Sequence, residues 1–303
     1  MAYGPLFHSA SGTVEADHNS GSHGRKTNEF YPLLPQLEAT SKTVLPLLAL
    51  QVTIFLNFGI CIGITISHAV ADGKSSNHFM KPWTSVCRLG GKDTSLILES
   101  LLVCDRTMIM DPKGIAISTL RDMEMINISK QSLIPPTKAF TDPVEKFLAT
   151  FVMGQSEIDR LKKWARERII EKNKQTTEPP PNFSSFVVTC TYVWVCWIKA
   201  LGPNVDKPRE HFICSVENRM HVEPLLPYTY FVARSPILLL YDTDFGWGRP
   251  TKVDIISISG TEAISLSERR DGEDGLEVGL PLKKEEIEAF ASFFSECING
   301  LPQ

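Results

Sequence analysis

The chain has 303 residues, 43% of them apolar and 22% charged, which suffices for one large globular domain or two ordinary ones. Its net charge is −4 and the basic residues of 162–168 are interleaved with acidic ones, so no nucleic-acid partner is expected. The most apolar stretch, residues 44–66, is interrupted by Asn57, Gly59 and Gly63, so it predicts buried strands rather than a membrane span.

Cysteine usage and the start of the chain suggest a compartment. The seven cysteines have no paired spacing of the kind that forms a zinc site or a disulfide framework. The first residues, MAYGPLFHSASG, lack the basic start and apolar run of a secretory signal. We therefore expect free thiols in the reducing cytoplasm and no membrane association.

In chain order, the first expected element is a loop, because the opening to about Arg25 is rich in Gly, Ser, His and Asn. Residues 46–67 contain two strand patterns joined at the turn NFG. In the second strand an isoleucine stands at every other position from Ile60 to Ile66, alternating with Cys, Gly and Thr. This period of two predicts one bulky and one small face.

The middle of the chain alternates helix patterns with irregular stretches. After HAVADG comes a helix pattern that places Phe79, Met80, Trp83 and Val86 on one side. The proline-containing residues 126–143 suggest a crossover linker, and residues 156–172 a charged amphipathic helix. Residues 185–200 are apolar on almost every side, which is compatible with a buried helix or a buried strand.

Towards the end, residues 235–245 and 252–259 resemble strands around a glycine-rich turn. A further strand is expected over 276–282, and an amphipathic helix over 283–298. Strands and helices in mixed order indicate an α/β fold, arranged as two domains.

A first candidate site is the run from His68 to Gly73. A histidine at the exit of a buried strand, just before a helix, can be presented to a cleft, and imidazole is suited to take a proton from a hydroxyl group. Asp72 could orient His68 or anchor the turn. The alternative is a structural histidine beside an Asp helix cap. A phosphate-binding loop would need a glycine where His68 stands, and neither further metal ligands nor a G-x-S-x-G elbow is present.

A second candidate is the run Asp244, Phe245, Gly246, Trp247 and Gly248. Its first three letters match the metal-binding motif of protein kinases, but the glycine-rich loop and the H-R-D loop of kinases are both missing. The residue types favour a tight turn between two strands, in which glycines supply positive φ and the tryptophan packs as an anchor.

Taken together, HxxxDG at a strand exit and DFGWG near the C-terminus resemble the signature of the BAHD acyltransferases, the plant HxxxD-type acyl-CoA transferases. NEFYPLLPQL, HAVADGKSSNHFMKPW, CDRTMIMDP, SFVVTCTYVWVCWIKA and YDTDFGWGRPTKVDIISI are similar, in this order, to stretches of the malonyltransferase branch. The resemblance extends from about Asp17 to Phe294.

The resemblance implies two chloramphenicol-acetyltransferase-like lobes with mixed sheets and a channel between them. The expected divisions are a first lobe at 1–125, a crossover linker at 126–145 and a second lobe at 146–303. It further implies that His68 is the general base, and that Asp72 pairs with Arg219 to support, with Gly73, the loop that carries the histidine. The DFGWG turn would shape the CoA side of the channel without taking part in the chemistry.

The same resemblance implies malonyl transfer from malonyl-CoA to a sugar hydroxyl of a phenolic or flavonoid glucoside, by a monomer with no cofactor or metal. Two departures qualify it. The chain starts inside the family's first lobe, and Tyr230-Phe231 runs directly into Val232, where family members have a long additional segment. Both lobes are thus expected to be incomplete, and the alternative is a catalytically inactive, truncated family member with at most a binding role.

Overall fold

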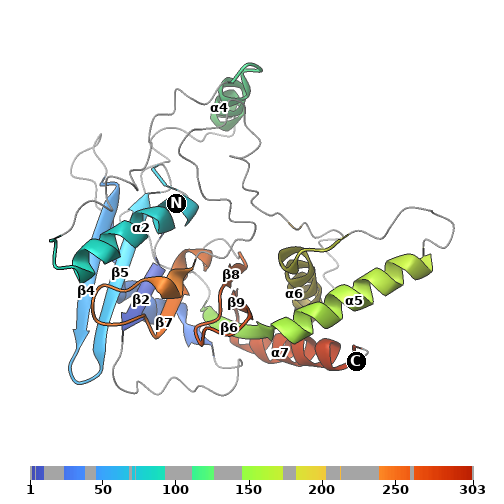
Figure 1. The fold of residues 1–303 in the computed structure, drawn as a ribbon. Coiled ribbons are helices and arrows are strands. Elements are labelled where there is room, and N and C mark those ends of the chain that lie inside the picture. The colour runs from blue at the N-terminus through green and yellow to red at the C-terminus, as the bar shows by residue number, and fades with distance from the viewer. Residues whose placement is uncertain are drawn as a thin grey trace.

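The computed structural model describes residues 2–3, 5–9, 24–37, 46–67, 70–71, 73–92, 111–125, 145–172, 182–202, 212, 239–259 and 263–301. Within these residues the fold is a mixed α/β arrangement of two sheets with helices packed on them (Figure 1). The α/β class expected from the sequence is confirmed.

The first sheet is built around β5 (Gly59–Ser67). On one side β5 pairs antiparallel with β4 (Leu48–Phe55), and on the other with β1 (Ala2–Tyr3) and β2 (Pro5–Ser9). The sheet is completed by β7 (Lys252–Ile255), which pairs with β2. A strand from late in the chain therefore joins strands from its beginning.

The second sheet has the order β3-β6-β9-β8, and all its pairs are antiparallel. Its strands are β3 (Arg25–Lys26), β6 (Phe147–Gly154), β8 (Ser265–Ser267) and β9 (Gly275–Leu282). Each sheet draws strands from both ends of the chain, while the division into lobes by residue number stays a prediction.

Helices cover the sheets unequally (Figure 1). The helix α2 (Gly73–Arg88) packs on the first sheet, and its Met80 is buried against Ile62 and Ile64 of β5. The second sheet packs with α6 (Ser185–Leu201) and α7 (Lys284–Asn299), while α5 (Gln155–Lys172) continues directly from β6. The short α4 (Ile115–Met125) stands apart from both sheets.

The small face of β5 has a structural cause. The 3-10 helix η1 (Tyr31–Leu33), which follows α1 (Thr27–Phe30), lies across it. Thr65 donates to the carbonyl of Pro35 at 2.6 Å, and a Cβ on Gly63 would collide with the carbonyl oxygen of Leu33. The backbone approaches so closely that only small side chains fit, and the predicted alternation of bulky and small faces is confirmed.

Most of the predicted elements are present. The strand pair with its NFG turn, the helix after HAVADG, the helices near 156–172 and 283–298 and the strand near 276–282 all occur. The ambiguous segment 185–200 is a helix, and its N-terminus is capped by Ser184, whose hydroxyl accepts from the backbone N–H of Val187 at 3.2 Å.

Two predictions are wrong in part. Residues 2–3, 5–9 and 25–26 are strands rather than loop, because they pair with distant strands and not because of any local pattern. Leu240–Asp242 and Ile256–Ile258 are the 3-10 helices η5 and η6 rather than strand. In η5 the backbone N–H of Tyr241 donates to the Glu268 carboxylate at 2.7 Å, so that N–H is not available to a strand ladder.

The outer strand β4 exposes apolar side chains. Leu50, Val52 and Ile54 point to the same face and are 45%, 59% and 69% exposed. Of their cross-strand partners on β5, Ile62 and Ile64 are buried in the apolar cluster that contains Met80 of α2, whereas Leu50, Val52 and Ile54 are outside it. Among the described helices, none combines the length and the apolar character that a bilayer crossing requires.

Candidate functional site

The HxxxDG run joins the central strand of the first sheet to its covering helix. β5 ends at Ser67 and α2 begins at Gly73. The Ser67 carbonyl accepts from the backbone N–H groups of Val70 and Ala71 at 3.0 and 3.4 Å, so the chain turns tightly after the strand. His68, Asp72 and Arg219 lie outside the described residues, and the roles predicted for them stay predictions.

The DFGWG turn is held together by one carboxylate. Oδ1 of Asp244 accepts from the backbone N–H groups of Gly246 at 2.8 Å and Gly248 at 3.0 Å. Both glycines have positive φ, +106° and +95°, which residues with a side chain rarely adopt. The sequence pattern therefore specifies this turn directly: an acceptor at its start and glycine at both strained positions.

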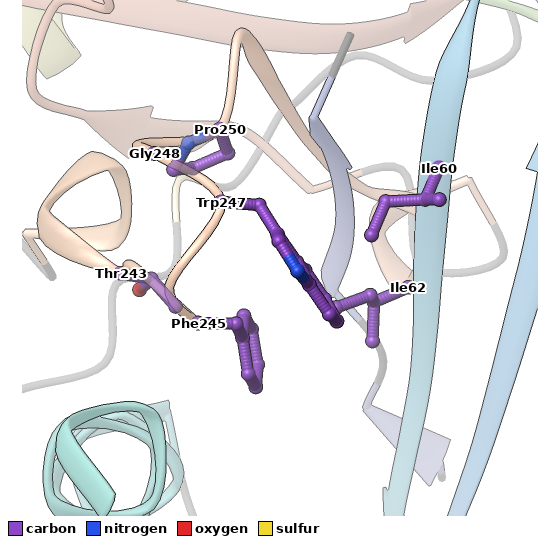
Figure 2. Close-up of a pocket in the computed structure, with 7 residues that line it drawn as sticks. All are labelled: Ile60, Ile62, Thr243, Phe245, Trp247, Gly248 and Pro250. Atoms are coloured by element: carbon purple, nitrogen blue, oxygen red, sulfur yellow. The ribbon is translucent and has the colours of Figure 1, made fainter. Parts of the chain in front are cut away.

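Two aromatic side chains of the turn point in different directions (Figure 2). Phe245 packs edge-on against Trp83 of α2, with ring centroids 4.9 Å apart. Trp247 is 66% exposed and lies beside Ile60 and Ile62 of β5. Together with Thr243 and Pro250 these residues line a hollow of about 270 Å³ that includes space open to solvent. The prediction that the tryptophan packs as an anchor is therefore wrong: Trp247 is a surface residue, and Phe245 is the anchor.

The turn and the HxxxDG run lie at different levels of β5. Trp247 lines its hollow with Ile60 and Ile62, whereas β5 ends at Ser67. Five residues of extended strand span roughly 17 Å, so the turn lies well away from the strand exit where His68 follows. The supporting role expected for the turn stays a prediction.

A polar cluster between the two sheets was not anticipated. Lys252 of β7 lies 3.1 Å from the hydroxyl of Thr150 on β6 and 3.8 Å from the carboxylates of Asp254 and Glu277. Tyr241 donates to Glu277 at 3.2 Å, and burial followed by the charge of Glu277 raises the pKa of Tyr241. Because both carboxylates are almost fully buried beside the ammonium group, this cluster joins the sheets electrostatically.

The sequence contains a weak indication of this polar cluster. Glu277 interrupts the apolar strand pattern LEVGLPL, and Asp254 interrupts KVDI. A carboxylate inside a buried strand needs a partner, and only the pairing of β7 with the first sheet brings Lys252 and β9 together. The cluster borders a second hollow of about 330 Å³, a volume that includes space open to solvent. Neither hollow is lined by the described neighbours of His68, namely Ser67, Val70 and Gly73.

Comparison with known proteins identifies the family. Residues 16–233 match the sequence profile of the Transferase family. The chain is 29% identical to phenolic glucoside malonyltransferase 2 of Arabidopsis thaliana, covering 96% of this chain and 76% of that protein. It is 30% identical to coumaroyl-CoA:anthocyanidin 3-O-glucoside-6''-O-coumaroyltransferase 1 of the same plant, over 84% of this chain and 67% of that one.

The chain therefore belongs to this family of transferases, the BAHD acyltransferases, and is a transferase of acyl groups. The fold agrees. The crystal structure of vinorine synthase superposes with a TM-score of 0.53 and 15% identity, covering 95% of this chain and 88% of that one. The two-lobed fold expected from the sequence resemblance is confirmed.

The alignment also supports the prediction that this chain lacks a segment that family members have. The match to phenolic glucoside malonyltransferase 2 extends over 362 residues, more than the 303 of the whole chain. That relative consequently has residues within the matched region that this chain lacks. The family profile ends its match at residue 233, next to the junction of Phe231 and Val232.

Proposed function

We propose that the chain transfers malonyl from malonyl-CoA to a sugar hydroxyl of a phenolic or flavonoid glucoside, with His68 as general base. The observation that best supports this proposal is the HxxxDG run, which lies between β5 and α2 in a chain that belongs to an acyltransferase family. Two relatives, a phenolic glucoside malonyltransferase and an anthocyanidin glucoside coumaroyltransferase, are both named for a glucoside acceptor.

In the proposed reaction, His68 removes the proton from the acceptor hydroxyl as that oxygen attacks the thioester carbonyl of the acyl-CoA. The tetrahedral oxyanion then collapses, the carbon–sulfur bond breaks, and the CoA thiol leaves with a proton. Asp72 pairs with Arg219 and holds the loop that aims His68. No covalent enzyme intermediate, metal or further cofactor takes part.

The donor is the least constrained part of the proposal, since one relative is named for malonyl and the other for coumaroyl transfer. A malonyl group carries a carboxylate and a coumaroyl group an aromatic ring, so the two make different demands on a binding site. A competition assay with equal malonyl-CoA and coumaroyl-CoA and one flavonoid glucoside separates them by product mass. We expect the malonyl ester to predominate, and a predominant coumaroyl ester would overturn the donor assignment.

The base assignment is tested with His68→Ala. Loss of a general base typically lowers the rate by about 10²–10⁴-fold. The matched control is His78→Ala, which removes another histidine ten residues on, within α2, and is expected to keep most of the activity. Equal product from wild type and His68→Ala would reject the mechanism.

The alternative is an inactive family member, and the exposed apolar face of β4 together with the residues missing relative to phenolic glucoside malonyltransferase 2 favour it. Measurements on a single protein preparation distinguish the active enzyme from the inactive family member. Cooperative thermal unfolding that shifts upward with CoA, together with ester formation, supports the enzyme. Absence of product and of any response to CoA from well-folded protein supports the inactive form.

A further inference from the structure

The packing of α6 against α7 brings two cysteines together, away from the HxxxDG and DFGWG runs. Cys196 on α6 is fully buried, and Cys297 on the last turn of α7 is partly exposed. Cys196 belongs to the buried apolar cluster of these helices, and Cys297 packs against that cluster; burial, and next the nearby Cys297, raises the pKa of Cys196 to about 12. Cys196 is therefore a buried thiol that lies near a second, more accessible one.

The helices are close enough at this level for a covalent link. The Tyr192 hydroxyl of α6 donates to the Phe294 carbonyl of α7, and the two rings pack with centroids 5.3 Å apart. Helix axes in such contact lie about 8–10 Å apart and each Cα lies about 2.3 Å from its axis, which leaves directly facing Cα atoms roughly 3.4–5.4 Å apart. Disulfides join Cα atoms about 4.4–6.8 Å apart.

A cation faces the accessible sulfur. The ammonium group of Lys199 lies 3.7 Å from Sγ of Cys297 and 5.9 Å from the centre of the Phe293 ring on the same helix. A positive charge beside a thiol stabilises the negative charge that sulfur carries when it reacts as a nucleophile. The three groups therefore form an ordered arrangement: an accessible sulfur, a cation beside it and a buried second thiol.

We propose that Cys196 and Cys297 are an oxidisable pair that forms a disulfide between α6 and α7 on exposure to a peroxide. The Cys297 thiolate attacks one peroxide oxygen, the O–O bond breaks, and the departing hydroxide takes a proton to become water. The Cys297 sulfenic acid that results is attacked by the Cys196 sulfur; the S–O bond breaks and a second water leaves. The two thiols are oxidised by two electrons in total and the peroxide is reduced to water.

The bond would tie together the two long helices that pack on the second sheet. It would close a loop between residues 196 and 297, which includes the DFGWG turn and all of β7, β8 and β9. A cross-link over so long a loop restricts the unfolded chain strongly. Oxidation is therefore expected to raise the unfolding midpoint of the full chain.

The test uses reduced full-length protein treated with a small excess of hydrogen peroxide and then digested without reductant. The expected product is a peptide pair joined through Cys196 and Cys297, which separates on reduction, together with a rise of the unfolding midpoint by several degrees before digestion. Oxidation of Cys297 to sulfinic or sulfonic acid without a cross-linked peptide would overturn the proposal, as would an unchanged or lower midpoint in cross-linked protein.

Variants resolve the order of events. Cys196→Ser should leave Cys297 as a sulfenic acid that a dimedone probe labels several-fold more than in wild type, and Cys297→Ser should abolish labelling at this site. Lys199→Gln should slow cross-linking several-fold, while Lys199→Arg keeps the charge and the rate. Cys87→Ser, at an exposed thiol on α2, is the matched control and keeps the cross-link. Undiminished cross-linking in Lys199→Gln would contradict the role of the cation.

Discussion

Phe245 meets the indole of Trp83 edge-on, with ring centroids 4.9 Å apart and ring planes at 82°. This contact joins the DFGWG turn to α2, the helix that begins at Gly73 directly after the HxxxD residues. The two motifs lie roughly 180 residues apart in the sequence but share one small apolar cluster with Met80 and Tyr241. The turn therefore packs on the helix that follows the HxxxD residues in the chain.

The first prediction concerns this anchor. Phe245→Ala removes the edge-on contact and part of the cluster, and is expected to lower the free energy of unfolding by about 2 kcal/mol. Trp247→Ala is the matched control from the same turn. Because Trp247 is 66% exposed, its replacement should change stability by no more than about 0.5 kcal/mol. Denaturant titration of both variants checks the difference, and equal losses would contradict the anchor role.

The second prediction concerns the carboxylate that closes the turn. Asp244→Ala leaves the N–H groups of Gly246 and Gly248 without their shared acceptor and should cost about 1 kcal/mol. Asp244→Asn keeps an oxygen at the same position and should cost less than half as much. Thermal unfolding of the two variants distinguishes them. If both lose the same stability, the charge rather than the hydrogen bonds holds the turn.

The third prediction tests the close approach of η1 to β5. A methyl group at Gly63 would collide with the backbone carbonyl of Leu33, so that β5 or the segment that carries Leu33 would have to shift. Gly63→Ala should therefore destabilise the chain by more than about 3 kcal/mol. At Gly154, the last residue of β6, the nearest atom to an added Cβ is Glu157 Oε2 at 3.6 Å, an ordinary contact.

Gly154→Ala is accordingly the control, with an expected change within about 0.5 kcal/mol. Chemical denaturation monitored by circular dichroism measures both variants on the same scale. Tolerance of Gly63→Ala comparable to that of Gly154→Ala would show that η1 does not lie against β5 as described.

The fourth prediction concerns pH. Burial raises the pKa of Glu268 above its ordinary value of 4.5, and one of its oxygens, Oε2, is buried without a hydrogen-bond partner among the described residues. Between the pKa of the unfolded chain and that of the folded protein, the folded state binds more protons. The contribution of Glu268 to the free energy of unfolding therefore falls as pH rises through this window, and the loss is complete above the folded pKa.

Glu268→Gln removes this titration and keeps an amide oxygen to accept from the Tyr241 backbone N–H. The variant should unfold at a higher temperature than wild type at pH 7, and the gap should close as pH falls below 4.5. Midpoints measured from pH 4 to 7 follow the gap. A gap that does not depend on pH would mean that packing, and not the charge, makes the difference.

Much of the local structure could be predicted, because the deciding interactions lie within a few residues. Alternate isoleucines specify β5, and an acceptor followed by glycines specifies the DFGWG turn. The apolar stripes of α2 and α7 and their lengths follow from a period of 3.6 residues. The family too could be recognised from the two motifs, and the sequence comparison confirms it.

Long-range pairing could not be predicted, because nothing local encodes it. The opening residues lack a strand pattern and become β1 and β2 only by pairing with β5 and β7. Leu240–Asp242 has strand-like composition but forms a 3-10 helix because Glu268, distant in sequence, accepts from the Tyr241 backbone N–H. In both cases a partner far along the chain decides the backbone conformation.

The sequence alone therefore determined the family, the DFGWG turn and the candidate base His68, since these depend on residue types at short, defined spacings. The tertiary structure alone decided that Phe245 of the turn packs on Trp83 of α2, that Lys252 of the first sheet contacts Glu277 and Thr150 of the second, and that Cys297 packs near the buried Cys196. Each of these relationships joins residues brought together by sheet pairing or helix packing, and the free energy of those contacts exists only once the whole chain has folded.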